Sequence, residues 1–180
     1  RVKVWNARGF QGGPGSERKV SLKTAESVAE ALKTLGAEVI EIDVDGPDFE
    51  VPSDVFVAMN IIHGTFGEDG QIQALLEQRG IPYTGAGVET SRIAFDKFLS
   101  KEKFIAAGVP TPLSQEFPLD GSDPLRIPFP LVAKPPREGS SVGVHIVHNE
   151  TEWQAAIEDS RQFGKTTMVE EYIEGKELTV

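Results

Sequence analysis

Four segments of the sequence contain residue types that could bind an anion or a small polar substrate. The first is the Gly-rich segment GGPGSERKVS, Gly12–Ser21. A Gly-rich loop that enters a helix offers free N–H groups and the positive end of the helix dipole to an anion. Glu17 would lie at this entrance, where its carboxylate could hold the ammonium group of an amino acid. A flexible loop with an ordinary acidic residue in the first helical turn explains the same pattern, and taken alone the pattern favours it.

The second segment, HGTFGEDG, spans His63–Gly70, after an apolar run and before a helical pattern. Ligands of parallel α/β units gather at the carboxyl ends of the strands, and this loop would occupy such a position. His63 is therefore a candidate residue of a substrate site. The alternative is a structural His bonded to the backbone, with Glu68 and Asp69 serving only as helix caps.

The third segment, KPPREGSSVGV, spans Lys134–Val144 and places a Lys at a strand end before a loop of small residues. Such a loop can fold over a triphosphate and donate backbone and hydroxyl hydrogen bonds, while the Lys supplies the countercharge. The segment lacks the Walker pattern G-x-x-x-x-G-K-[ST]. A β-hairpin with a long flexible tip is the alternative, but the flanking Lys134 and Arg137 favour phosphate binding.

The fourth segment, VEEYIEGKELTV, spans Val169–Val180 and alternates apolar with acidic residues. This alternation suits a half-exposed edge strand. Alternatively, the flat apolar surface of Tyr172 and Ile173 could contact adenine, with Glu170 or Glu177 accepting amino or hydroxyl hydrogens. The pattern leaves both interpretations open.

Lys97 would by itself be interpreted as a solvated helix residue. The nearby aromatic residues Phe95, Phe98 and Phe104 are more typical of a core than of a cofactor site.

Composition limits the classes of protein to which the chain could belong. The 180 residues are 39% hydrophobic, which is enough to bury a core, and carry a formal net charge of -10. This charge disfavours non-specific binding to nucleic acid or to a membrane surface. The absence of cysteine excludes disulfides and zinc-thiolate sites. With no apolar run long enough to cross a bilayer and no pattern of a signal peptide, we expect a cytoplasmic location.

Hydrophobic periodicity predicts a small parallel α/β unit in the first half of the chain. The predicted elements are a strand at Val2 and Val4, a Gly-rich stretch Gly9–Gly15, a helix with Leu22, Ala25, Val28, Ala29, Leu32 and Leu35 on one face and closed by Gly36, a strand Glu38–Val44, an apolar run Val55–Ile62, a helix around Ile72, Leu75 and Leu76 that ends at Gly80, and a short strand in Ile81–Gly87.

The second half begins with one or two helices and continues into mixed α and β structure. The predicted elements are helix within Val88–Ala107, extended connections through the Pro-rich stretch 110–136, strands at Leu131–Lys134 and Val142–Val147, a helix Glu150–Phe163 capped by Asn149 or Thr151, and strands Thr167–Ile173 and Lys176–Val180 joined as a hairpin at Glu174 and Gly175. We place the domain boundary so that residues 1–94 form one domain and residues 95–180 the other.

Taken together and in this order, the four segments closely resemble D-alanine–D-alanine ligases, a family of the ATP-grasp class. The resemblance covers Gly12–Val180 and includes HGTFGEDGQIQALLEQRGIPYTGAGVETS, the Asp96-Lys97 pair, AAGVPTP and KPPREGSSVGV. It implies a Rossmann-like N-terminal (pre-ATP-grasp) domain that binds substrate, followed by a linker helix and a small α+β ATP-grasp central domain. It also implies ATP-dependent ligation of two D-alanine molecules through an acylphosphate, for peptidoglycan synthesis.

The resemblance also implies roles for individual residues. Glu17 resembles the acid near the ammonium of the first D-alanine, with Ser21 and His63 in the same substrate site, and Ser140 resembles the loop serine linked to Glu17 in the catalytic network. The residues expected to contact ATP are Lys97, Lys134, Glu138, Ser140, Ser141, Glu170, Glu171, Tyr172, Ile173 and Glu177. No metal ligand is expected in this chain, because the family holds Mg²⁺ in its C-terminal domain.

The sequence departs from the family pattern in two places. NARGFQ, between the predicted first strand and Gly12, would make that connection longer than in the family, which affects the placement of Glu17. No counterpart of the family's C-terminal domain follows Val180. We therefore expect the 180-residue chain alone to be inactive, as part of a longer protein.

Two alternatives remain open at this stage. The chain could be a non-catalytic fragment or a regulatory nucleotide-binding module, or a ligase for another carboxylate and amine, such as a D-lactate or D-serine variant. The expected binding partners are D-alanine and ATP. We expect no binding to nucleic acid or to a membrane. A homodimer is one of the assemblies left open.

Overall fold

A computed structural model describes residues 6–51, 55–176 and 178 of the chain. The chain divides into two compact units, one ending at Phe95 and the other beginning at Asp96. The sequence predicted a boundary between residues 94 and 95, with a substrate-binding domain before it and an ATP-grasp central domain after it. These domain assignments stay predictions.

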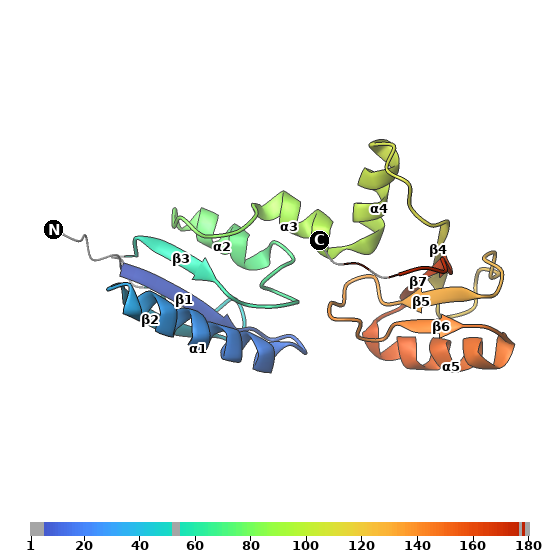
Figure 1. The fold of residues 1–180 in the computed structure, drawn as a ribbon, viewed down its shortest axis with the longest axis horizontal. Coiled ribbons are helices and arrows are strands. Elements are labelled where there is room, and N and C mark those ends of the chain that lie inside the picture. Colours follow the sequence, from blue (N-terminus) through green and yellow to red (C-terminus); the bar gives the residue numbers. More distant parts are fainter. Residues whose placement is uncertain (1–5, 52–54, 177, 179–180) are drawn as a thin grey trace. The chain divides into compact units, whose positions relative to one another are not determined.

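The first unit is a three-stranded parallel sheet in the order β2-β1-β3, with helices on both faces (Figure 1). Its elements are β1 Asn6–Gly12, α1 Arg18–Thr34, β2 Glu38–Val44, β3 Val57–Asn60, α2 Gln71–Gln78 and α3 Val88–Phe95. Parallel strands need crossover connections, and α1 supplies the connection from β1 to β2. The predicted parallel α/β unit is therefore confirmed.

Two sets of buried side chains hold this sheet between its helices. Ile72 and Leu76 of α2 belong to one core cluster with Phe10 of β1, Val44 of β2 and Ala58 of β3. On α1, the small residues Ala25 and Ala29 are 2% and 4% exposed, so this helix approaches the sheet closely. The predicted strand Glu38–Val44 is confirmed, but Leu35, predicted on the buried face of the helix, is 76% exposed.

The first described strand lies later in the chain than the sequence indicated. β1 is formed by NARGFQG, the segment that had been interpreted as a long connection, whereas the predicted strand residues Val2 and Val4 lie outside the described residues. β1 is the central strand and pairs with both β2 and β3, so its backbone hydrogen bonds outweigh the weak strand propensity of Gly9 and Gly12. The Gly-rich connection before α1 is therefore shorter than expected.

The loop and helix after β3 follow the prediction closely. α2 ends two residues before Gly80, which adopts a positive φ of 67° as a helix-terminating glycine does. The residue that caps α2 is Gly70, although Asp69 Oδ1 still accepts the Gln71 N–H at 3.0 Å. The short strand predicted in Ile81–Gly87 is reduced to one bridge between Ala58 and Tyr83.

The second unit contains a four-stranded antiparallel sheet in the order β4-β7-β5-β6 (Figure 1). Its elements are α4 Lys97–Ala106, β4 Ser114–Pro118, β5 Leu131–Lys134, β6 His145–Val147, α5 Glu150–Ser160, the 3₁₀ helix η1 Arg161–Phe163 and β7 Thr166–Glu171. Asn149 caps α5 by accepting the Glu152 N–H at 3.0 Å, as one of the two predicted capping residues. The predicted α+β architecture of this half is confirmed.

Alternate residues of β5 and β7 face opposite sides of this sheet. Leu131, Ala133 and Val169 join the core cluster that includes Trp153 of α5. Lys134 pairs with Met168 in the register between β5 and β7, so Lys134 and Glu170 are diagonal neighbours on the other face. One face of the sheet therefore builds the core, and the other presents charged groups.

The interpretation of the last segment as an exposed edge strand is wrong. β7 lies between β4 and β5, and residues Thr167 to Glu170 are all buried. Burial on both faces requires partners for the polar residues, and Thr167 Oγ1 donates to the Lys134 carbonyl at 3.0 Å. The second strand of the predicted hairpin, Lys176–Val180, falls largely outside the described residues.

Candidate functional site

A cavity of about 290 Å³ lies on the charged face of the sheet in the second unit. α4 supplies one wall and the strands β5 and β7 supply another. The lining residues are Lys97, Ser100, Lys101, Phe104, Thr111, Pro112, Lys134, Met168 and Glu170. Lys134, a candidate from its own motif, and Lys97, a candidate from the family resemblance, therefore line one cavity.

The start of α4 places two lysines on the same wall. Asp96 caps the helix, and its Oδ1 accepts the N–H groups of Phe98 at 2.9 Å and Leu99 at 3.3 Å. Lys97 is the first helical residue and Lys101 follows one turn later, so both side chains project from one face. The Asp96 cap thus fixes where α4 begins, and with it the face from which Lys97 and Lys101 project.

Glu170 lies at the centre of the charged face with a different lysine at each carboxylate oxygen. Oε1 accepts from Lys101 Nζ at 2.6 Å, and Oε2 is paired with Lys134 Nζ. Burial alone would raise the pKa of Glu170, but the hydrogen bonds from Lys101 and Lys134 outweigh burial and hold its pKa below the usual value. Glu170 is therefore a buried carboxylate that remains charged.

Lys97 differs from the other two lysines because its Nζ donates to a main-chain oxygen, the Glu138 carbonyl, at 2.6 Å. Desolvation and the charge of Lys134 lower the pKa of Lys97 below that of an ordinary lysine. A cation that is half-buried beside another cation binds an incoming anion well, because the anion relieves both the desolvation and the repulsion.

The loop between β5 and β6 is attached to the start of α4 at successive positions. The Lys97 N–H donates to the Pro136 carbonyl at 3.0 Å, and Arg137 Nε forms an ion pair with Asp96 Oδ2 at 2.8 Å. β5 and β6 do pair as an antiparallel hairpin, but its connection is held in place at these points. The start of this connection is therefore attached to α4, and its phosphate-binding role stays a prediction.

Ser140 and Ser141, in the middle of this loop, both adopt the left-handed backbone conformation, with φ of 52° and 59°. Non-glycine residues rarely adopt this conformation, which costs about 1–2 kcal/mol per residue. Both side chains are exposed, whereas Glu138 is half-buried. Backbone strain of this kind gathers at ligand-binding loops, which is consistent with a phosphate-contacting role for the two serines.

Glu171 is the last residue of β7, and the residues that follow it leave the sheet and become exposed. Glu171 is engaged with the chain, because its Oε1 accepts the Leu113 N–H at 3.0 Å and its own N–H donates to the Leu113 carbonyl at 3.0 Å. Tyr172 and Ile173 are 36% and 61% exposed, and Glu177 lies outside the described residues. Adenine contacts by these residues stay predictions.

In the first unit, the three candidate substrate residues Glu17, Ser21 and His63 come together at the carboxyl ends of β1 and β3. Ser21 Oγ accepts the His63 N–H at 2.9 Å and donates to the Glu17 carbonyl at 3.2 Å. A Cβ atom added at Gly64 would lie 2.6 Å from Glu17 Oε2, so the Glu17 carboxylate rests against the backbone of the His63 loop. Residues 42 positions apart in sequence therefore form one cluster.

His63 has side-chain partners on both sides of its ring. Nε2 lies 3.2 Å from Thr24 Oγ1 of α1, and Nδ1 lies 3.5 Å from Glu68 Oε1 of its own loop. The ring is thus oriented by two elements, as a substrate-positioning group requires, and Glu68 contacts the His instead of serving only as a helix cap. The resemblance links Glu17 with Ser140 of the second unit, and that link stays a prediction.

Sequence reasoning missed Lys101, Thr111 and Phe104. Phe104 was assigned to a core, but it is 48% exposed and lines the cavity. The signal for Lys101 was its spacing of one helical turn from Lys97, which places both on the same face. Nothing local in the sequence indicates that this face would be buried, since its partner Glu170 lies 69 residues away.

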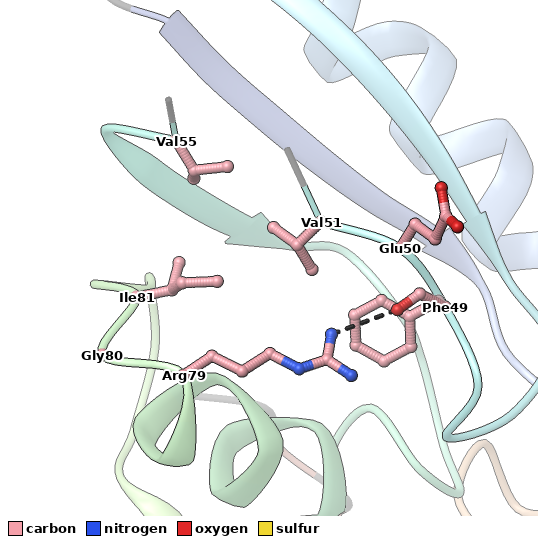
Figure 2. A pocket seen from close by; sticks show the side chains of 7 residues that line it. All are labelled: Phe49, Glu50, Val51, Val55, Arg79, Gly80 and Ile81. Carbon is pink, nitrogen blue, oxygen red and sulfur yellow. Dashed lines mark hydrogen bonds between the residues drawn. The ribbon is translucent and has the colours of Figure 1, made fainter. Parts of the chain in front are cut away.

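A second cavity, of about 560 Å³, lies in the first unit beside α2 and is shown in Figure 2. Its cationic residue, Arg79, extends toward Phe49: Nη1 donates to the Phe49 carbonyl at 3.2 Å, and Cζ lies 4.6 Å from the centre of the Phe49 ring. The guanidinium is therefore engaged with the chain itself, and the described residues that line this cavity include no cluster of charged groups like that of Lys97, Lys134 and Glu170.

The described residues contain no group of three or more His, Cys, Asp or Glu side chains arranged to hold a metal ion. No helix among them combines the length and the apolar character that crossing a membrane requires.

Two family models match the sequence. The model described as D-ala D-ala ligase N-terminus matches residues 47–86, and the model described as D-ala D-ala ligase C-terminus matches residues 123–180. These ranges include the His63 loop of the first unit and both the β5–β6 loop and β7 of the second.

Similar proteins extend the match over nearly the whole chain. A D-alanine–D-alanine ligase of Methylacidiphilum infernorum is 48% identical over 173 residues, which cover 95% of this chain and 56% of the relative. The crystal structure of the Bacillus anthracis D-alanine–D-alanine ligase superposes with a TM-score of 0.83 at 32% identity and covers 96% of this chain and 59% of that one. A second structure of the Bacillus anthracis enzyme, complexed with ATP, superposes with the same TM-score of 0.83 at 31% identity, covering 97% of this chain and 58% of that one. The chain thus spans somewhat more than half the length of the relatives it matches.

Proposed function

Because the chain belongs to the D-alanine–D-alanine ligase family, we propose that the whole protein joins two D-alanine molecules with the free energy of ATP hydrolysis, for peptidoglycan synthesis. The carboxylate of one D-alanine would be activated as an acylphosphate, and the amine of the second would displace the phosphate. The chain described above would supply one wall of the nucleotide site and the site of the first D-alanine.

The observation that carries this proposal is the shared cavity of Lys97 and Lys134 beside the loop with Ser140 and Ser141. Phosphoryl transfer depends mainly on the placement of positive charge and on the exclusion of water. Two ammonium groups can neutralise part of the negative charge of the triphosphate, while the serine hydroxyls and backbone N–H groups of the loop donate further hydrogen bonds. Half-buried cations supply more attraction than solvated ones, because the local dielectric is lower.

The substrate side of the proposal rests on Glu17, Ser21 and His63. Glu17 would accept hydrogen bonds from the ammonium of the first D-alanine, and N–H groups at the start of α1 would hold its carboxylate. His63, oriented by Thr24 and Glu68, would position this substrate. Glu17 and Ser140 are the residues we assign to the catalytic network.

The remaining contacts of ATP would come from the end of β7 and from parts of the whole protein beyond this chain. We assign adenine and ribose contacts to Glu170, the backbone from Glu171 to Ile173, and Glu177, and further loop contacts to Glu138. Mg²⁺ would be held outside this chain and would neutralise charge on the phosphates. A cytoplasmic location, where ATP is present, and a homodimer are parts of the same proposal.

The proposal is tested by measuring phosphate release and dipeptide formation when the whole protein is given ATP, Mg²⁺ and D-alanine. We expect D-alanyl-D-alanine and phosphate in equal amounts. ATP binding without dipeptide would contradict the ligase assignment and favour a regulatory nucleotide-binding module. Preferred incorporation of D-lactate or D-serine at the second position would instead favour a ligase of different specificity.

The nucleotide assignment is tested by replacing Lys134 with Ala. Removal of a charged contact should weaken ATP binding by about 2–3 kcal/mol, measured by calorimetry. Lys165→Ala is the matched control, because Lys165 precedes β7 of the same sheet and is exposed. An unchanged ATP affinity in Lys134→Ala would refute the assignment of Lys134.

A further inference from the structure

Lys101 is a buried cation that neither the motifs nor the proposed nucleotide contacts include. Its side chain is only 7% exposed, less than the 24% of Lys134 in the same cavity. Burial of an ammonium group is costly unless the charge is paired and hydrogen-bonded. Partners that offset the cost of burying the Lys101 ammonium group must therefore lie close to it.

The partners of Lys101 are specific and well placed. Nζ donates to Glu170 Oε1 at 2.6 Å and to Thr111 Oγ1 at 2.8 Å. The other oxygen of Glu170 is paired with Lys134 Nζ. A continuous chain of contacts therefore runs from Thr111 through Lys101 and Glu170 to Lys134.

The balance of charge along this chain decides how strongly Lys134 can attract an anion. Lys101, Glu170 and Lys134 together carry a net charge of about +1, since two cations share one carboxylate. Without Lys101, Glu170 and Lys134 would form a neutral pair, and the attraction between them would compete with any phosphate for the Lys134 ammonium. Lys101 thus neutralises Glu170 from the buried side.

We propose that Lys101 is a positioning residue that acts through Glu170 to keep the ammonium of Lys134 available for the phosphates of ATP. This inference rests on the proposed function, because it assumes that the cavity binds ATP. It assigns to Lys101 an electrostatic effect on Lys134 and no direct contact with the nucleotide.

The experiment is a cycle of variants in the whole protein: Lys101→Met, Glu170→Gln and the double variant. Lys101→Met alone should raise the Kd for ATP about 10- to 30-fold, as for a lost charged interaction. In the Glu170→Gln background the same replacement should change the Kd less than about 3-fold, because no carboxylate remains to compete for Lys134. A direct phosphate contact by Lys101 would cost the same factor in both backgrounds and would overturn the proposal.

Two further measurements separate positioning from a general loss of structure. The Kd for D-alanine in the absence of ATP should be unchanged in Lys101→Met, because Glu17, Ser21 and His63 belong to the other unit. Lys103→Met is the matched control on the exposed side of the same helix and should leave ATP binding unchanged. A parallel loss of both ligands in Lys101→Met would identify a folding defect and overturn the proposal.

If Lys101→Met does not fold, Thr111→Val replaces it in the cycle, since this change removes only the hydroxyl that Lys101 contacts. The expected increase in Kd is then smaller, about 2- to 5-fold, and should again disappear in the Glu170→Gln background. An equal increase in both backgrounds would overturn the proposal. If the wild-type protein does not bind ATP, the proposed function fails and this inference fails with it, whereas an unaffected Lys101→Met variant overturns the inference alone.

Discussion

Among single residues, Lys97 shows how a protein can prepare a cation for an anionic ligand. Desolvation and the neighbouring Lys134 lower its pKa, while the charges of Glu138, Asp96 and Glu170 act in the opposite direction. A bound phosphate would favour the charged form of Lys97 and raise its pKa again. At a pH at which Lys97 is partly neutral, binding of ATP should therefore be accompanied by uptake of a proton by Lys97.

This coupling predicts a pH dependence of ATP affinity. Lys97 is fully charged below its lowered pKa and neutral above it, so the affinity should already fall over the alkaline range below the pKa of an ordinary lysine. Lys97→Arg keeps its charge through this range, so its affinity should decrease less. Calorimetric titrations of both proteins across the range provide the measurement, and parallel curves would contradict the assignment of the effect to Lys97.

Among the elements, the loops carry the candidate chemistry and the strands determine where the loops begin. The β5–β6 loop is held to the start of α4 by the Arg137–Asp96 ion pair and by the hydrogen bond from Lys97 N–H to Pro136. In the first unit, the loop after β3 brings Gly64 against Glu17. Each loop is therefore fixed by a contact with a helix start distant in sequence.

The contact between Gly64 and Glu17 predicts a specific effect of Gly64→Ala. The new methyl group would meet Glu17 Oε2 at 2.6 Å, and because this atom ends a flexible side chain, the carboxylate should move while the fold persists. We expect the Kd of the whole protein for D-alanine to rise about 10-fold, as for a weakened charged hydrogen bond. Ligand titration by calorimetry provides the measurement.

Gly80→Ala is the matched control for this prediction. Gly64 and Gly80 have similar positive φ angles of 72° and 67°, but a Cβ at Gly80 would meet nothing within 4 Å. Both replacements should therefore lower the stability by about 1 kcal/mol through backbone strain, whereas only Gly64→Ala should weaken D-alanine binding. Equal D-alanine affinities in the two variants would show that the Gly64 contact does not position Glu17.

Across the whole molecule, two cores support two separate sets of candidate residues. The cluster around Phe10 and Ile72 belongs to the first unit, and the cluster around Leu131 and Trp153 belongs to the second. The candidate D-alanine residues lie in the first and the candidate phosphate residues in the second. The relatives that match both units extend well beyond them, since the chain covers 56% and 58% of two of these proteins.

This coverage predicts that the 180-residue chain alone does not synthesise the dipeptide. Part of the nucleotide site and the ligands of Mg²⁺ are expected in the remaining portion of the whole protein, so the transferred phosphoryl group would lack much of its charge stabilisation. The measurement is dipeptide formation by this chain with ATP, Mg²⁺ and D-alanine, with the whole protein as the positive control. Turnover by the 180-residue chain would show that the residues described above are sufficient.

The sequence by itself determined the features that depend on neighbours along the chain. The limits of β2 and β5, the cap at Asn149 and the glycine that ends α2 all follow from local periodicity and backbone preference. The motifs also placed Lys134 and His63 among the candidate site residues, and the family resemblance added Lys97. Sequence patterns record local energetics well, because the interacting groups lie within a few residues of one another.

Only the tertiary structure decided which of these segments are buried and which groups meet. The weak strand pattern of Asn6–Gly12 became the central strand β1 because it pairs with strands on both sides. The acidic alternation after Thr166 became the buried strand β7, where Glu170 meets Lys101 across 69 positions of sequence. These outcomes depend on long-range pairing and on the cost of burying charge, and neither quantity is encoded in a local window of residues.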